Sequence, residues 1–298
     1  MWRSFMKNCE ESFTQVLNKK VGWIPLFSVL VSAMVFTACD PAEDEIKLGY
    51  VEWDSEIAST HVVAAVIQDE LGYEVSLQSA EAGPMWAGIA RGDFDAIVAA
   101  WLPATHEAYW NDFADDVVDL GPNLEQARIG LVVPAYTPIE SITELNDLYD
   151  ELDGRIVGID PGAGLMAATE DAIEVYGLEL DLLEGSDAAM TAALESAISN
   201  EEHIVVTGWT PHWKFASYDL KYLEDPEGVF GDAEAIHTIV TPQLQEEHPD
   251  VYEFLDKFYW TNEQIGEVMV LIEEGMQPME AARAWLEDND ETLQSWLN

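Results

Sequence analysis

The feature that most constrains the fold of this chain is a regular alternation of short apolar segments with segments of helical periodicity. Between residues 46 and 100, three segments have a strand pattern, and the two segments between them place apolar residues at helical spacing. The predicted strands cover 46–51, 73–78 and 94–100, and the predicted helices cover 56–72 and 83–93. Because short strands that alternate with helices favour parallel pairing, this region predicts a βαβαβ block.

The same order recurs later in the chain and predicts a second βαβαβ block. Its predicted strands cover 154–159, 178–184 and 202–208, and its predicted helices cover 164–176 and 187–199. The segment RIGLVVP (128–134) lies between the blocks and is expected to be a strand that crosses from one block toward the other. After about residue 235 we expect one strand, AIHTIVT (235–241), and four helical segments.

Two such blocks, joined by chain crossings, predict an α/β fold with two lobes. Lobe one would comprise 46–135 together with 235–298, and lobe two would comprise 136–234. In open α/β sheets, ligands bind beyond the carboxyl ends of the strands. We therefore expect a ligand cleft between the lobes.

The N-terminal segment has the layout of a secretory signal peptide, which we predict to cover 1–38. A basic start is followed by an apolar run, Val21 to Phe36, which is shorter than the roughly 20 residues of a spanning helix. The small residues before Cys39 resemble the lipobox of bacterial lipoproteins, which implies cleavage before Cys39 and a lipid on its sulfur. Residues 39–45 would then form a lipidated acidic linker. The alternative is an uncleaved N-terminal anchor, and both place the remainder outside the cytoplasmic membrane.

The charge of the mature chain limits its partners. From Cys39 onward it has 8 basic and 56 acidic residues, a formal charge of −48. Such a charge excludes nucleic acid and anionic membrane surfaces as electrostatic partners. We infer an environment of high salt, where charges are screened over short distances. Because Cys39 is the only cysteine of the mature chain, an intramolecular disulfide and a cysteine metal cluster are both excluded.

The third strands of the two blocks end in matching motifs, AAWLPATH and TGWTPHW. Trp101 and Trp209 therefore occupy equivalent positions, and each is followed by one residue and a proline that would end the strand. Trp53 follows the first strand of block one, in YVEWD. The first strand of block two instead ends in a glycine-rich turn, GIDPGAGLM. We expect three tryptophans and one glycine-rich turn to meet at one cleft, although packing in the core is the alternative for such side chains.

The chemistry of these groups predicts a small zwitterionic ligand. Indole faces attract cations, most strongly when the cation is desolvated, and a quaternary ammonium has no N–H group that requires a carboxylate partner. The glycine turn precedes a helix, so amides near Gly164 and Leu165 would form an anion site at its positive end. His106 would add a hydrogen-bond donor, with a helix-capping or surface histidine as the alternative. A methylated-amine zwitterion such as glycine betaine fits both ends.

Four segments resemble the glycine betaine-binding proteins of ABC transporters, which have the type II periplasmic-binding-protein fold. The segments are GYVEWD, the WLPATH segment, GIDPGAGLMAAT, and IVVTGWTPHW with its following YDLKYLEDP. The resemblance implies a tryptophan cage for the trimethylammonium group, with a carboxylate held by two backbone amides and a histidine. It also implies that the lobes close over the ligand and deliver it to a membrane permease with a cytoplasmic ATPase. Carried over residue by residue, the site comprises Trp53, Trp101, Trp209, His106, Gly164 and Leu165.

Three alternatives remain at this point. The ligand could be choline, carnitine or ectoine rather than glycine betaine or proline betaine. The chain could also be an exported enzyme that acts on methylated amines, but no catalytic base or cofactor site is recognisable, and we expect no enzyme activity and no cofactor. We expect no metal site either, because HEAYW, which begins at His106, lacks the second histidine of H-E-x-x-H. The segment GAGLMA (162–167) matches the dinucleotide fingerprint only weakly.

Overall fold

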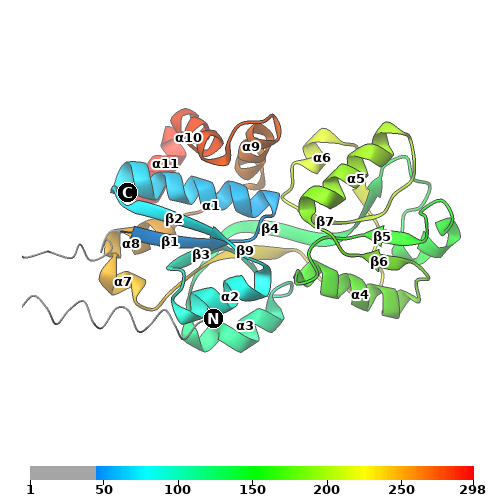
Figure 1. Cartoon of the computed structure of the whole chain (residues 1–298), viewed down its shortest axis with the longest axis horizontal. Coiled ribbons are helices and arrows are strands. Elements are labelled where there is room, and N and C mark those ends of the chain that lie inside the picture. The colour runs from blue at the N-terminus through cyan, green and yellow to red at the C-terminus, as the bar shows by residue number, and fades with distance from the viewer. Residues whose placement is uncertain (1–44) are drawn as a thin grey trace, which may run out of the picture. The chain divides into compact units, whose positions relative to one another are not determined.

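The computed structural model describes residues 45–298 (Figure 1). The predicted signal peptide, Cys39 and all but the last residue of the predicted linker lie outside the described residues. That last residue, Glu45, begins the first strand rather than ending a linker. Within 45–298, no helix is both long enough and apolar enough to cross a membrane.

The first βαβαβ block is confirmed. It consists of β1 (Glu45–Tyr50), α1 (Asp54–Val66) with a π-helical turn η1 (Ile67–Leu71), β2 (Glu74–Ser79), α2 (Ala82–Arg91) and β3 (Ala96–Leu102). The strands β1 and β2 pair in parallel, as do β1 and β3. Gly72 and Gly92 end the two helical segments in left-handed conformations, which glycine adopts without steric cost.

The second block is also confirmed, with helices at the predicted bounds. It consists of β5 (Arg155–Val157), α4 (Gly164–Tyr176), β6 (Asp181–Leu183), α5 (Asp187–Ser199) and β7 (Val206–Thr210). The hydroxyl of Ser186 caps α5 by accepting a hydrogen bond from the Ala189 amide, at 3.2 Å. Here too, the three strands pair in parallel.

Connecting elements join the blocks into one continuous ladder of strands. They are α3 (Glu107–Phe113), η2 (Ala114–Asp116), β4 (Val118–Pro134), η3 (Ile142–Leu148), α6 (Lys214–Ser217), β8 (Leu220–Tyr222) and β9 (Glu234–Val240). The strand order is β2-β1-β3-β9-β4-β7-β5-β6, and β8 pairs with β4. Each parallel trio therefore has an antiparallel strand beside its third strand, β9 in the first sheet and β4 in the second.

Strand β4 belongs to both sheets. Its residues up to Ala127 pair with β9, whereas its residues from Arg128 onward pair with β7 and β8. Gln126, which lies two residues before Arg128, has a left-handed backbone with φ of 62°. The segment 128–134 is thus a strand in the crossing region, as predicted. We propose that the first boundary between the lobes lies here rather than at 135/136.

The chain ends in helices that pack on the first sheet and on α1. They are α7 (Leu244–Glu247), α8 (Pro249–Lys257), α9 (Asn262–Glu273), α10 (Pro278–Asp288) and α11 (Asp290–Leu297). The structure has five helices after β9 where four were predicted, because Pro249 begins a new helix immediately after His248. Trp260, Trp285 and Trp296 are buried in this region.

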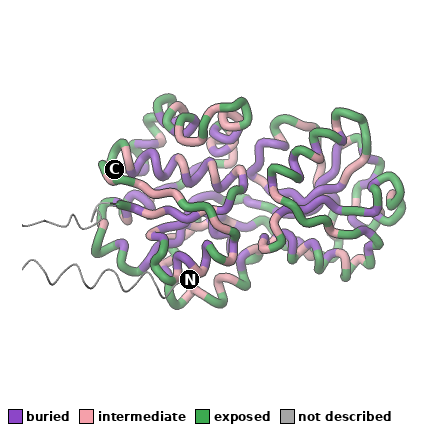
Figure 2. Tube along the Cα trace, in the orientation of Figure 1, coloured by how far each residue is buried: buried purple, intermediate pink, exposed green. Residues whose placement is uncertain are grey.

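The hydrophobic core lies along the two sheets and the helices that cover them. Figure 2 shows buried chain along the central strands and along the inner faces of the helices, with exposed chain on their outer faces. In Figure 1, α1, α9 and α10 lie on one side of the first sheet, and α2 and α3 lie on the other.

Candidate ligand-binding site

The predicted tryptophans come together with the glycine turn around a small cavity. The space between atoms there, part of which is open to solvent, is about 280 Å³. Trp101 and Trp209 occupy the next-to-last positions of β3 and β7, and Trp53 lies three residues beyond β1, directly before α1. All three are at most 5% exposed. The cavity is lined by Trp53, Trp101, Thr105, Ile129, Ile159, Ala163, Gly164, Leu165 and Trp209.

Two of the indole rings are held by hydrogen bonds between residues of the two blocks. The Nε1 of Trp53 donates to Asp160 Oδ2 at 2.9 Å, and the Nε1 of Trp209 donates to Ser55 Oγ at 3.2 Å. The ring centroids of Trp53 and Trp209 are 6.3 Å apart at an interplanar angle of 53°. Because the rings are tilted rather than stacked, both can present a face to one enclosed group. The Nε1 of Trp101 is buried without a hydrogen-bond partner within residues 45–298.

His106 is fully buried beside the cage, although it is not one of the residues that line the cavity. Its Nδ1 accepts hydrogen bonds from the Trp101 backbone amide at 3.1 Å and from Trp86 Nε1 at 3.3 Å. The ring hydrogen must therefore be on Nε2, which is buried and has no partner in the described part of the chain. Burial lowers the pKa of His106 to about 3, so the ring is neutral at physiological pH.

The structure thus excludes both alternatives for His106, a surface residue and a helix cap. His106 occupies the N-cap position of α3, but its side chain makes no capping bond there. Its ring centroid lies 6.4 Å from that of Trp53. A neutral imidazole whose buried Nε2–H has no partner among the described residues is a donor that can bind a carboxylate.

The helix α4 begins at Gly164, and no side chain caps it. The first amides of a helix have no acceptor within the helix, so those of Gly164 and Leu165 are available at its positive end. Gly164 also packs against Thr105, and a Cβ atom on Gly164 would lie 2.0 Å from the Thr105 carbonyl oxygen. Thr105 is in turn held by Glu234, whose Oε2 accepts hydrogen bonds from the backbone amides of Ala104 and Thr105.

Tyr109 makes a contact that the sequence did not predict. Its hydroxyl donates to the carbonyl oxygen of Gly162 at 2.7 Å, joining α3 to the glycine turn of the second block. Within the segment 99–110, Thr105 also lines the cavity and Tyr109 holds the turn, in addition to the predicted Trp101 and His106.

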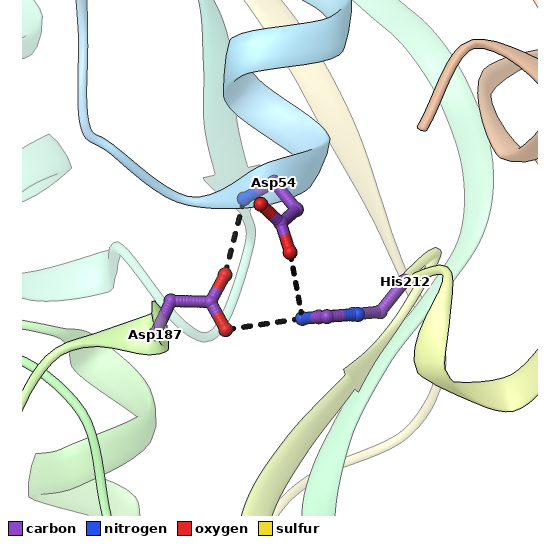
Figure 3. Close-up of side chains that lie close together, drawn as sticks. All are labelled: Asp54, Asp187 and His212. Carbon is purple, nitrogen blue, oxygen red and sulfur yellow. Dashed lines mark hydrogen bonds and ion pairs between the residues drawn. The ribbon is translucent and has the colours of Figure 1, made fainter. Parts of the chain in front are cut away.

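A second polar cluster lies beside the cage and was not visible in the sequence. Figure 3 shows Asp54 at the start of α1, Asp187 at the start of α5, and His212 after β7. The Asp54 amide donates to Asp187 Oδ2 at 3.1 Å. The Nε2 of His212 lies 3.1 Å from Asp187 Oδ1 and 3.6 Å from Asp54 Oδ2. These residues are far apart in the sequence and match no local motif.

The charges in this cluster are strongly perturbed. Burial, together with the charge of Asp187, raises the pKa of Asp54 to about 6. Burial works against ionisation of Asp187 too, but His212 and Lys214 beside it hold its pKa below the usual range. Burial lowers the pKa of His212 to about 4 and that of Lys214 to about 8. At neutral pH the ammonium of Lys214 therefore supplies the positive charge of the cluster.

Comparison with known proteins identifies the family of this chain. The family described as "Substrate binding domain of ABC-type glycine betaine transport system" matches residues 44–288. Over 155 residues, the chain is 47% identical to the glycine betaine/carnitine transport binding protein GbuC of Listeria monocytogenes serotype 1/2a (strain 10403S). That match covers 51% of this chain and spans only about half, 52%, of the Listeria protein.

Solved structures match over a larger share of the chain. Lactococcal OpuAC, in its closed-liganded conformation with glycine betaine, is 41% identical with a TM-score of 0.81, covering 86% of this chain and 100% of that one. An ABC-transporter choline-binding protein in complex with choline is 27% identical with a TM-score of 0.78, covering 85% of this chain and 91% of that one.

These matches confirm the α/β fold of two lobes that periplasmic substrate-binding proteins share. The cavity, its tryptophans and the glycine turn lie where the strands of both sheets end. With the matched family covering nearly all described residues, this chain belongs to the family of substrate-binding domains of ABC-type glycine betaine transport systems.

Proposed function

We propose that this chain is an extracytoplasmic substrate-binding lipoprotein that captures glycine betaine or proline betaine for an ABC importer. The observation that carries the proposal is the pairing of two unlike ends at one cavity. Three indoles and the uncapped start of α4 line the cavity, and His106, a buried neutral donor, lies beside it. A compact zwitterion with a methylated ammonium and a carboxylate complements both ends.

The cationic end of the ligand would be held by Trp53, Trp101 and Trp209. Cation–π attraction is about 2 kcal/mol or more when the cation is desolvated, and these rings are nearly fully buried. A quaternary ammonium has no N–H donors that would need carboxylate partners. The apolar lining suits such a group better than it suits a primary amine.

The carboxylate would be bound by the Gly164 and Leu165 amides and by His106 Nε2. These groups are donors without an internal acceptor, so a carboxylate would satisfy them without breaking existing bonds. Because the histidine is neutral, the site does not depend on a titrating cation near physiological pH. We propose that the site contains no metal and needs no cofactor.

Closure of the lobes would be the step that retains the ligand in the site. Three hydrogen bonds each join a residue of one lobe to a residue of the other: Trp53 to Asp160, Trp209 to Ser55, and Tyr109 to Gly162. A ligand that contacts both sides favours the closed state through contacts that the open state lacks. We propose that the closed form is then recognised by a membrane permease with a cytoplasmic ATPase, and that a lipid on Cys39 tethers the protein to the membrane.

Choline is the second candidate, because one similar structure is a choline-binding protein in complex with choline. Choline carries the same trimethylammonium group but lacks a carboxylate, which would leave the His106 donor and the α4 terminus unused. A buried donor without a partner costs about 1–3 kcal/mol. The donors of this site therefore favour a betaine over choline.

Calorimetric titration tests the proposal. Glycine betaine, proline betaine, choline, carnitine and ectoine would be titrated into the mature protein at low and at high salt. We expect the betaines to bind most tightly, with affinity retained at high salt because desolvated contacts are poorly screened. Tighter binding of choline than of either betaine would contradict the carboxylate assignment. Mass spectrometry of the recovered ligand should show it unaltered, and a converted product would instead indicate an enzyme.

A further inference from the structure

Lys214 is a fully buried cation in a chain that has very few cations. The mature chain has 8 lysines and arginines. Of these, Lys214 is the one that is buried, with 0% of its surface exposed. Its Nζ lies 4.1 Å from the centroid of the Trp209 ring and has no hydrogen-bond partner in residues 45–298. Burial of an ammonium without a direct partner is costly, so nearby negative charge must stabilise it.

The position of Lys214 relative to Trp209 excludes a direct role in ligand contact. Trp209 lines the cavity, whereas Lys214 does not. The ammonium lies over the Trp209 ring while remaining outside the lining of the cavity. The tryptophan wall formed by Trp209 is therefore in contact with a buried cation.

Two carboxylates from different lobes meet next to this cation. Asp54 belongs to α1 of the first block, and Asp187 belongs to α5 of the second, and the Asp54 amide bonds the Asp187 carboxylate. The Nε1 of Trp213 donates to Asp54 Oδ2, and His212 lies between the two carboxylates (Figure 3). Lys214 interacts electrostatically with both carboxylates.

The remaining charged groups near Asp54 do not replace Lys214. His212 is a neutral donor at neutral pH, and Glu273 on α9 adds a further negative charge. Asp54 lies against Asp187 in this structure, and Lys214 is the cation that offsets their repulsion. Two nearby carboxylates without a cation would oppose closure.

We propose that Lys214 is a positioning residue for ligand capture, which offsets the negative charge of Asp54 and Asp187 across the lobe boundary and packs against Trp209. This inference rests on the proposed function, since it concerns closure over a betaine. It assigns to Lys214 an action through Asp54 and Trp209 rather than a contact with ligand. The prediction that follows is specific: loss of the Lys214 charge should be relieved by loss of the Asp54 charge.

The test is a double-mutant cycle with Lys214→Met and Asp54→Asn. Glycine betaine affinity is measured by calorimetry for wild type, both single variants and the double variant. We expect Lys214→Met to weaken binding by about tenfold or more, because it leaves two buried carboxylates without a cation. Asp54→Asn in the same chain should restore most of the affinity, since an amide oxygen can still accept the Trp213 hydrogen bond without a charge.

The matched control is Lys221→Met, which removes a lysine paired with Glu140 on the surface of the same lobe. Its affinity should equal that of wild type. Unchanged or tighter binding by Lys214→Met, or additive losses in the double variant, would overturn the inference. A wild-type protein that binds no compound of the panel would instead defeat the proposed function. In that event, thermal unfolding of the same four proteins without ligand still measures the Asp54–Lys214 coupling, and zero coupling would refute the inference.

Discussion

Gly164 packs so closely against Thr105 that any side chain at this position would collide with the backbone across the cavity. A Cβ atom would lie 2.0 Å from the Thr105 carbonyl oxygen. Glu234 holds the Thr105 amide, so the obstacle is fixed backbone rather than a movable side chain. The glycine is therefore required where the second lobe meets the first, and it also begins the helix whose first amides would bind the proposed carboxylate.

Replacing Gly164 by alanine should weaken betaine binding while leaving each lobe folded. Overpacking costs of about 1–3 kcal/mol would fall on the closed state. Calorimetry and thermal unfolding measure the two effects separately. The control is Gly266→Ala in α9, where an added Cβ meets nothing within 4 Å, and this change should raise stability slightly through helix propensity. Normal binding by Gly164→Ala would show that the contact with Thr105 relaxes freely.

Replacing Trp101 by alanine should weaken binding by about 1–2 kcal/mol or more, because one wall of the cage is lost. Trp110→Ala is the comparison, since Trp110 packs edge-on against Trp86 and does not line the cavity. Titration with glycine betaine measures both variants. Equal affinities for wild type and Trp101→Ala would remove Trp101 from the site.

Replacing His106 by asparagine should separate betaine from choline. The asparagine oxygen can take over the Nδ1 acceptor role toward Trp101 and Trp86, whereas the donor at Nε2 is lost. We expect betaine affinity to fall by about 1–3 kcal/mol and choline affinity to change little. His106→Gln, which places an amide near the Nε2 position, should recover part of the betaine affinity. A parallel loss for both ligands would indicate a purely structural histidine.

The stability of the protein should fall in acid partly because of His106. Its pKa is about 3 when folded, below the ordinary value of 6.5. A lowered pKa means that the unfolded chain binds the proton first, so this contribution is complete above pH 6.5 and is lost as the pH falls toward 3. Urea unfolding of wild type and His106→Asn between pH 7 and pH 4 should show a smaller acid-induced loss in the variant. Parallel pH profiles would refute the assignment of a neutral buried imidazole.

The sequence predicted the parts of the fold that depend on local pattern. The helices 164–176 and 187–199 were predicted at their observed bounds, because apolar spacing and a following turn residue define them locally. The matching ends of β3 and β7 placed Trp101 and Trp209 correctly. The full length of β4 was missed, since Gly121 and Pro122 interrupt its strand pattern and pairing continues there only through irregular register.

Tertiary contacts explain what was not predicted at the site. Asp54, Asp187 and Lys214 come from three separate elements, and no spacing in the sequence relates them. In a chain with 58 acidic residues, no feature of the sequence distinguishes these charges from ordinary surface charges. Only the folded structure shows that these charges share one buried region.

The chain passes between the two sheets twice, once through β4 and once through the segment that leads from β8 to β9. Two tethers remove most of the rotational freedom that a single linker would leave. With two connections, the lobes would swing about the crossings rather than twist apart or search many mutual orientations. Most of the entropy cost of bringing the two sides of the site together is therefore incurred during folding. Little of the ligand's binding energy is then needed to order the lobes.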